Sequence, residues 1–280
     1  MKKFILTVVI ILAVLCAAFV VLYVLAFYGN PVSRGLAKKT ATAYLEESYS
    51  DTDYVLEGVH YNFKTGDYFG VVSSPSSPDS SFSVTVSPLG KLLYDDYSVR
   101  VVGRQNTADR IYKVYNEALE AALFGEQFPY TVHILHGNII YKDSFEIGSF
   151  VPDGAVEMNS LILDGKYDID EVSAIAAEAG RITVYVYDED VSVEKMAEIL
   201  LLIRDVLDSN GIGFFCVDAV LEHPGDAGET RVGRVEVMDF KYSEIYAEGL
   251  ALRVDEYNRA AEEYYKEQDE IKLSSGQSAE

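Results

Sequence analysis

The pattern of apolar and polar positions changes several times along this chain, and each change predicts an element. The first pattern is an apolar run from Phe4 to Tyr28, in which Thr7 is the one conventionally polar side chain. As a helix this run would rise roughly 37 Å at about 1.5 Å per residue, more than the roughly 30 Å hydrocarbon core of a bilayer. Residues 1–29 therefore predict a transmembrane helix.

Two other interpretations of this segment require processing. A secretory signal is cut after small residues, and cleavage at Cys16-Ala17-Ala18 would leave an apolar stretch beginning at Phe19 as the new N-terminus. A lipoprotein would be acylated at Cys16, but Leu15 stands where such a signal has Gly or Ala. We therefore expect an uncleaved signal anchor.

Flanking charges predict the orientation of this anchor. Lys2 and Lys3 precede it, and Arg34, Lys38 and Lys39 follow it. The short cationic tail resembles the start of a secretory signal, whereas the downstream sequence turns acidic. We expect a single-pass cell-membrane protein of a bacterial envelope, with a cytoplasmic N-terminus and extracytoplasmic C-terminal domains.

Residues 30–126 predict a helix followed by an antiparallel sheet. Asn30-Pro31 combines a capping residue with Pro at the first helical position, and helical spacing continues to about Ser48. Period-two alternation then predicts a hairpin around Lys64–Asp67, a loop over 73–81 and further strands over 82–86 and 92–94. An amphipathic helix over 107–124 ends at Gly125, where we place the domain boundary.

Residues 127–268 predict alternating strands and helices. Strands are expected over 130–135, 139–141, 182–187, 214–221 and 232–240, with an exposed loop over 222–231. Asp168-x-x-Glu171 is a capping box, and Ser192 caps a second helix. A long charged helix starts at Tyr242, and residues 269–280 form a disordered tail. The predicted fold class is α+β, with a ferredoxin-like sandwich in this half.

Parts of the sequence resemble known families. The stretch Ser83-Val84-Thr85-Val86-Ser87-Pro88-Leu89-Gly90-Lys91-Leu92-Leu93 resembles the turn of a PepSY-like module, a helix-plus-antiparallel-sheet fold of the PepSY or cystatin kind. Gly29-Asn30-Pro31-Val32-Ser33, the Lys38-Lys39 helix and Glu57-Gly58-Val59-His60-Tyr61-Asn62-Phe63 resemble the YfjL-like family of uncharacterised Gram-positive membrane-anchored proteins. The second resemblance implies an envelope location and gives no information about activity.

Charge and cysteine content narrow the function classes. The net charge of −22 argues against nucleic acid or anionic lipid as a partner. It permits cationic peptides, amines or loosely held divalent ions. The chain has two cysteines, Cys16 in the predicted membrane segment and Cys216 in the distal half, so we expect no disulfide between them.

The motifs that suggest catalysis are incomplete. Ser192-Val193-Glu194-Lys195 matches S-x-x-K and Lys64-Thr65-Gly66 matches K-T-G, but their order is reversed and S-D-N is missing. His133-x-x-His136 is spaced so that the two rings of a regular strand point to opposite faces, and His60 and His223 are isolated. We predict no catalytic, cofactor-binding or metal-binding residues.

Other candidate sites have simpler explanations. Asp188-Glu189-Asp190 and the Asp164–Glu171 stretch could attract calcium, but acidic residues are also expected where helices begin. Gly211-Ile212-Gly213 ends a helix and lacks the third Gly of a dinucleotide loop. A tyrosine stripe on the last helix, formed by Tyr257, Tyr264 and Tyr265, is expected to pack on the sheet or bind a partner.

Taken together, these features predict an uncharacterised membrane protein that acts by binding. The expected partners are the membrane, through the N-terminal helix, and a protein or peptide at the cell surface, with no nucleic acid and no cofactor. Exposed sheet edges could accept an added strand. A cell-surface hydrolase and a purely structural or sensory tether remain the alternatives.

Overall fold

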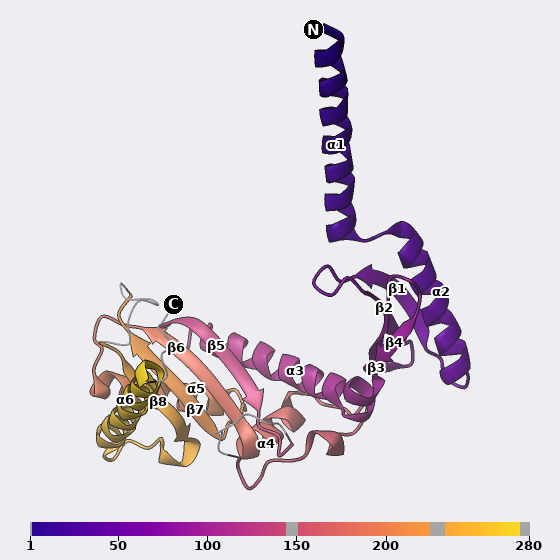
Figure 1. Ribbon diagram of the computed structural model, residues 1–280. Helices are drawn as coiled ribbons and strands as arrows, with labels where there is room; N and C mark the ends of the chain where they lie inside the picture. The colour runs from indigo at the N-terminus through magenta and orange to yellow at the C-terminus, as the bar shows by residue number, and fades with distance from the viewer. Residues whose placement is uncertain (1, 144–150, 225–232, 275–280) are drawn as a thin grey trace. The chain divides into compact units, whose positions relative to one another are not determined.

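The chain forms two compact units in the computed structural model (Figure 1), which describes residues 2–143, 151–224 and 233–274. The first unit comprises Met1–Thr107 with Ile162–Asp164, and the second comprises Ala108–Leu161 with Gly165–Glu280. The predicted boundary near Gly125 is corrected to Thr107, because the apolar face of helix α3 (Gln105–Leu123) lies in the core of the second unit.

The N-terminal helix requires a further correction. Helix α1 spans Lys2–Tyr28, and most of its described large side chains, such as Phe4, Leu15 and Phe19, are exposed. Crossing a bilayer requires about 20 consecutive apolar residues. Among the described residues, no helix is both long enough and apolar enough for this. This finding contradicts the predicted transmembrane helix and signal anchor. It also contradicts the predicted single-pass topology with extracytoplasmic domains.

The first unit places helix α2 (Pro31–Ser48) on an antiparallel sheet of order β1-β2-β3-β4. Asn30 caps α2, because its Oδ1 accepts a hydrogen bond from Val32 N at 2.8 Å. The strands are β1 (Val55–Tyr61), β2 (Tyr68–Ser74), β3 (Ser77–Val86) and β4 (Leu92–Asp95), followed by the short π-helix η1 (Ser98–Val102).

The core of the first unit lies between this helix and this sheet. The buried α2 residues Ala37, Ala41 and Leu45 are four apart and therefore share one face. They pack in one cluster with buried side chains of the sheet, which are Tyr68, Val72, Phe82, Val84 and Val86. Much of the predicted loop over 73–81 is strand, because β2 continues to Ser74 and β3 begins at Ser77.

The second unit is a mixed sheet of order β5-β6-β7-β8. Its strands are β5 (Thr131–Ile139), β6 (Gly180–Tyr187), β7 (Cys216–Glu222) and β8 (Val235–Lys241). Its remaining helical segments are η2 (Met158–Ser160), α4 (Ile169–Ala179), α5 (Val193–Ser209), η3 (Tyr242–Glu244) and α6 (Leu250–Ser274). The separate strand predicted over 139–141 is not formed, since β5 is one strand that ends at Ile139.

The strand order corrects the predicted ferredoxin-like sandwich. Strands β6 and β7 are parallel and adjacent, whereas β5 and β8 pair antiparallel on either side of them. A ferredoxin-like chain instead contains a split β-α-β unit, in which another strand lies between the two parallel ones. Helix α5 connects the neighbours β6 and β7 directly, so the sheet follows chain order. The α+β class itself is confirmed.

The second unit is packed by alternating residues of its central strands. Ile182, Val184 and Val186 of β6 are fully buried, and they cluster with α5 residues such as Ile199 and Ile203. Helix α6 lies against β8, where Asn258 Oδ1 accepts a hydrogen bond from Glu236 N at 2.8 Å. The predicted tail is helical as far as Ser274, and its remainder lies outside the described residues. Most of the predicted loop over 222–231 also lies outside them.

Candidate functional site

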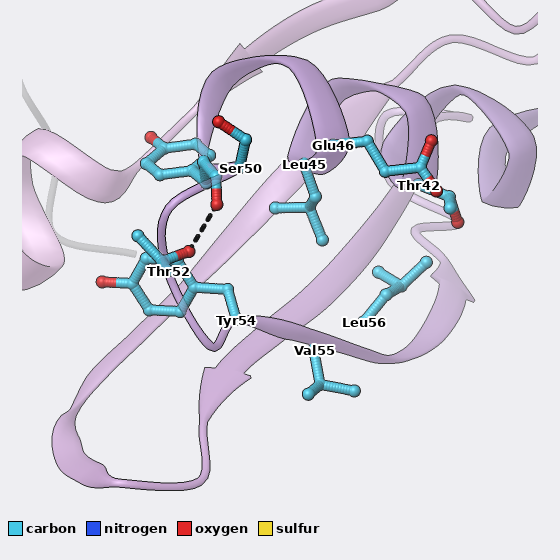
Figure 2. Close-up of a pocket in the computed structure, with 9 residues that line it drawn as sticks. Thr42, Leu45, Glu46, Ser50, Thr52, Tyr54, Val55 and Leu56 are labelled. Carbon is cyan, nitrogen blue, oxygen red and sulfur yellow. Dashed lines mark hydrogen bonds between the residues drawn. The ribbon is translucent and has the colours of Figure 1, made fainter.

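The first unit contains a pocket of about 300 Å³ between the end of α2 and the start of β1. Figure 2 shows Thr42, Leu45 and Glu46 on the helix side, and Tyr54, Val55 and Leu56 on the side of the following segment. The turn between them is fixed by Thr52, whose Oγ1 donates a hydrogen bond to Tyr49 O at 2.6 Å. We call this hollow the α2/β1 pocket; its lining is completed by Tyr49, Ser50 and Thr52.

Two of the lining tyrosines belong to an aromatic cluster inside the first unit. The ring of Tyr49 lies 5.5 Å from that of Tyr54 and 5.1 Å from those of Phe82 and Tyr97. Most of these contacts are edge-to-face or tilted, which are favourable aromatic geometries. The wall of the α2/β1 pocket is therefore held by packing as well as by the backbone.

Asp95 anchors the same cluster from β4. Its Oδ2 accepts hydrogen bonds from the hydroxyls of Tyr44 and Tyr49, the second at 3.4 Å. The bond to Asp95 raises the pKa of Tyr44, while burial and then the charge of Asp95 raise the pKa of Tyr49. Both hydroxyls therefore stay protonated and available as donors, so neither serves as a base at neutral pH.

The surroundings of the α2/β1 pocket are acidic. Residues 40–63 contain five acidic residues and no Lys or Arg; all five are exposed, and they are Glu46, Glu47, Asp51, Asp53 and Glu57. Asp53 accepts hydrogen bonds from Ser74 Oγ at 2.6 Å and Ser76 N at 3.2 Å. The bond from the Ser74 hydroxyl is the main reason that the pKa of Asp53 is lowered. This region therefore favours positively charged groups.

The lining of the α2/β1 pocket combines one carboxylate with hydroxyl groups and aromatic rings. Its described polar groups are one carboxylate, that of Glu46, and the hydroxyls of Ser, Thr and Tyr residues. A hydroxyl becomes a nucleophile when an adjacent base removes its proton, and the lining provides no His or Lys for this. A carboxylate beside aromatic rings can instead bind an ammonium or guanidinium group.

The S-x-x-K motif forms a helix cap, as the sequence analysis concluded. Ser192 Oγ accepts a hydrogen bond from Lys195 N at 3.2 Å at the start of α5. The amine of Lys195 bonds to Glu198 Oε2 at 2.8 Å instead of Ser192. Lys64-Thr65-Gly66 lies in a turn of the other unit, where Gly66 adopts a φ of 79°. Each motif therefore has a local structural role, as a helix cap and as a turn.

His133 and His136 lie on the same face of β5, and not on opposite faces as predicted for a regular strand. A bulge between Val132 and Ile134 inserts an extra residue into β5. His133 then stacks on Tyr187 at 3.9 Å, on the face to which His136 belongs through its pairing with Thr183. His133 Nε2 lies 2.9 Å from Glu222 Oε1.

The remaining acidic candidates have local partners. Asp164 Oδ1 accepts hydrogen bonds from Ser77 Oγ at 2.9 Å and from Asp79 N at 3.1 Å. Asp168 caps α4 in the predicted capping box with Glu171. Glu189 Oε2 lies 2.8 Å from His223 Nε2. The prediction that His223 is isolated is therefore wrong. Among the residues that the structure describes, no group of three or more His, Cys, Asp or Glu side chains is placed to hold a metal ion.

The glycine and tyrosine candidates are structural. Gly211 has a φ of 69° and follows α5, whose end it marks. Tyr257 packs on Phe240 with their ring centres 4.6 Å apart, and Tyr265 donates a hydrogen bond to Glu236 Oε1 at 2.9 Å. The predicted packing of this stripe on the sheet is confirmed for these two residues, while Tyr264 is half exposed.

The second unit has hollows of its own. One of about 510 Å³ has mainly apolar walls that include Ile212 and Phe214, and its carboxylate, Asp208, already accepts a hydrogen bond from Tyr242 at 3.0 Å. Another of about 350 Å³ lies between β8 and α6 and includes Tyr264. Neither combines an uncommitted carboxylate with an acidic surrounding, as the α2/β1 pocket does.

Sequence reasoning missed the α2/β1 pocket. Its carboxylate, Glu46, is one of two adjacent acids near the end of α2, and Tyr49 and Tyr54 stand outside the periodic segments. Two signals were present: the recurrence of Tyr every five residues at 44, 49 and 54, and the lack of Lys and Arg over 40–63. Neither signal shows that α2 and β1 enclose a hollow, which depends on tertiary contacts.

Comparisons with known proteins identify a family. A model of the YfjL-like N-terminal domain matches residues 1–96, and a model of the YfjL-like C-terminal domain matches residues 115–255. No curated protein matches the chain.

Among solved structures, the crystal structure of a DUF5037 family protein from Ruminococcus gnavus ATCC 29149 is 15% identical. The match covers 67% of this chain and 74% of that chain with a TM-score of 0.20, too low to carry any argument. Because the two domain models together match most of the sequence, the chain belongs to the YfjL-like family.

Proposed function

We propose that this protein is a non-catalytic binding protein whose α2/β1 pocket receives a positively charged group of its ligand. The observation that carries the proposal is the pairing of the Glu46 carboxylate with the tyrosine walls of the pocket, Tyr49 and Tyr54. An ammonium or guanidinium group gains from both, through an ion pair and through the negative face of an aromatic ring.

The charge around the α2/β1 pocket supports this ligand class. Five acidic residues lie over 40–63, the stretch that forms the pocket lining, and this stretch contains no Lys or Arg; Lys38, Lys39 and Lys64 lie just outside it. The whole chain carries a net charge of −22, which steers cations toward it and repels anions. A peptide rich in Lys or Arg, or a polyamine, fits this field, whereas nucleic acid does not.

The lack of catalysis is part of the proposal. The lining contains no His or Lys to activate its hydroxyls, and the sequence motifs for acyl transfer form a helix cap and a turn. The order of one helix followed by an antiparallel sheet also supports the PepSY-like relationship of the first unit, which we retain as a proposal.

Calorimetric titration with spermine and with a lysine-rich peptide tests the proposal. We expect both to bind, with affinity that falls as salt screens the charges. Because an exposed ion pair contributes about 0.2–1 kcal/mol, Glu46→Gln should weaken binding by up to about fivefold. Glu263→Gln, which removes an exposed acid of α6 in the second unit, is the matched control and should bind like the wild type.

The outcome that contradicts the proposal is equally specific. If a fully acetylated lysine peptide bound as tightly as the free one, charge would not be what the pocket selects. The same conclusion follows if Glu46→Gln and Glu263→Gln lowered the affinity equally, because the effect would then come from net charge alone.

A further inference from the structure

Strand β1 is the open edge of the first sheet. The order β1-β2-β3-β4 leaves one side of β1 without a paired strand among the described residues. The other edge strand, β4, has only four residues, while β1 has seven. Edges are commonly protected by short length, Lys, Pro or a β-bulge. From Val55 to Tyr61 β1 contains neither Lys nor Pro, and its bulge lies between Leu56 and Gly58, before the regular stretch that ends at Tyr61.

The register identifies which backbone groups face outward. Asn62 N donates to Asp67 O at 2.9 Å, so Asn62 faces β2 at the end of the hairpin. Antiparallel strands alternate between residues that bond to the partner and residues that point away from it. The paired positions Tyr61↔Tyr68, His60↔Phe69 and Val59↔Gly70 then place the N–H and C=O groups of Tyr61 and Val59 on the open side.

The start of β1 leads into the α2/β1 pocket. Val55 and Leu56 are the first residues of β1 and also line the pocket. A chain lying along β1 would therefore end beside the pocket and could place one side chain in it. Successive side chains of such a chain alternate between the two faces of the sheet, which fixes which of its positions reach the pocket.

We infer that an extended, basic polypeptide segment adds to β1 as a fifth strand and places a Lys or Arg side chain in the α2/β1 pocket. This inference rests on the proposed function and specifies its ligand. Main-chain hydrogen bonds along Val59 and Tyr61 would hold the segment, and the acidic surroundings would select its charge.

Charge also decides between the possible occupants of this edge. A second copy of the chain, paired antiparallel through its own β1, would bring the Glu57 side chains of the two strands close to each other and would place two strongly acidic chains together. Like charges placed opposite each other across strands are destabilising. A basic segment instead neutralises these residues, so it is the occupant that the edge favours.

Backbone methylation of the peptide tests the added strand without altering the protein. The probe is a seven-residue peptide of alternating Val and Thr with a Lys at each end, N-methylated at one amide at a time. Methylation of the amides that face β1 should weaken binding at least tenfold, because it removes a hydrogen bond and adds a clash. Methylation of the alternate amides should have little effect.

Hydrogen exchange of the wild-type protein gives an independent readout. The amides of Val59 and Tyr61 should become protected when the peptide binds, while that of His60, which already bonds to β2, should change little. Spermine should not produce this protection, because it has no peptide backbone.

The outcomes separate the two proposals. If spermine and the peptide bind and depend on Glu46, but methylation shows no alternation, the added strand is wrong and the proposed function stands. If neither binds, both are wrong. If the Val59 and Tyr61 amides are already protected in the free protein in a concentration-dependent way, a second copy occupies the edge and the inference is overturned.

Discussion

Gly137 of β5 packs closely against α3, and adding one methyl group there should destabilise the second unit. A Cβ atom at this position would overlap the Leu119 side chain and lie 2.7 Å from two ring carbons of Tyr115. Both side chains are fully buried. The strand cannot easily move away, because the Asn116 side chain bonds to both Gly137 N and Gly137 O at 2.8 Å.

These contacts determine how much stability Gly137→Ala should lose. Inserting a methyl into a well-packed core typically costs about 1–3 kcal/mol, while replacing Gly by Ala within a strand recovers about 0.5–1 kcal/mol. Since two buried side chains must shift and the backbone is held, we expect Gly137→Ala to lower the free energy of unfolding by about 2 kcal/mol. In a unit of this size that corresponds to a fall in Tm of about 4–8 °C.

Urea denaturation at 25 °C, followed by far-UV circular dichroism and tyrosine fluorescence, measures this change; the chain contains no Trp. Gly35→Ala is the matched control, because Gly35 is exposed within α2 and a Cβ there meets nothing within 4 Å. It should raise stability by about 0.5–1 kcal/mol. Unchanged or increased stability in Gly137→Ala would refute the close packing of α3 on β5.

A double variant checks the cause of the loss. Leu119→Ala removes one of the two overlapping side chains, so the combination with Gly137→Ala should be less destabilising than the sum of the single changes. Strict additivity would mean that the methyl group acts elsewhere.

Three further predictions follow from local contacts. The pKa of Asp168 is lowered from 3.8 to about 2, mainly by its bond to Lys166. The stability that Asp168→Ala removes should therefore be present above pH 4 and vanish as the pH falls through 2. An equal difference in urea midpoint between wild type and variant at pH 7 and at pH 2 would contradict this. Cys216 is buried, and its pKa is raised to about 11. In a Cys16→Ser variant, Cys216 of the folded protein should therefore react with iodoacetamide at pH 8 at least about a hundredfold more slowly than in the urea-unfolded chain. Equal rates would mean that Cys216 on β7 is accessible to the reagent in the folded protein. Asn30→Ala should cost the first unit about 1 kcal/mol in thermal melts by removing the cap of α2, whereas Asn30→Asp, which retains a capping oxygen, should cost much less.

The two sheets show where sequence periodicity is sufficient and where it is not. The caps at Asn30, Asp168 and Ser192 were predicted because capping depends on residues a few positions apart. The bulge at His133 was not predicted, because a two-residue period assumes a regular strand. It places His133 beside Glu222 of β7, a residue that the chain reaches only two strands later.

The sequence alone determined the class of the fold, most of its helices and the acidic character of the segment between α2 and β1, since these depend on local spacing and composition. Tertiary structure decided that α3 belongs to the second unit, that β6 and β7 are parallel neighbours, and that Tyr49 and Tyr54 join Phe82 and Tyr97 in a wall beside Glu46. These outcomes depend on which distant surfaces bury each other, and no local pattern in the chain encodes that choice.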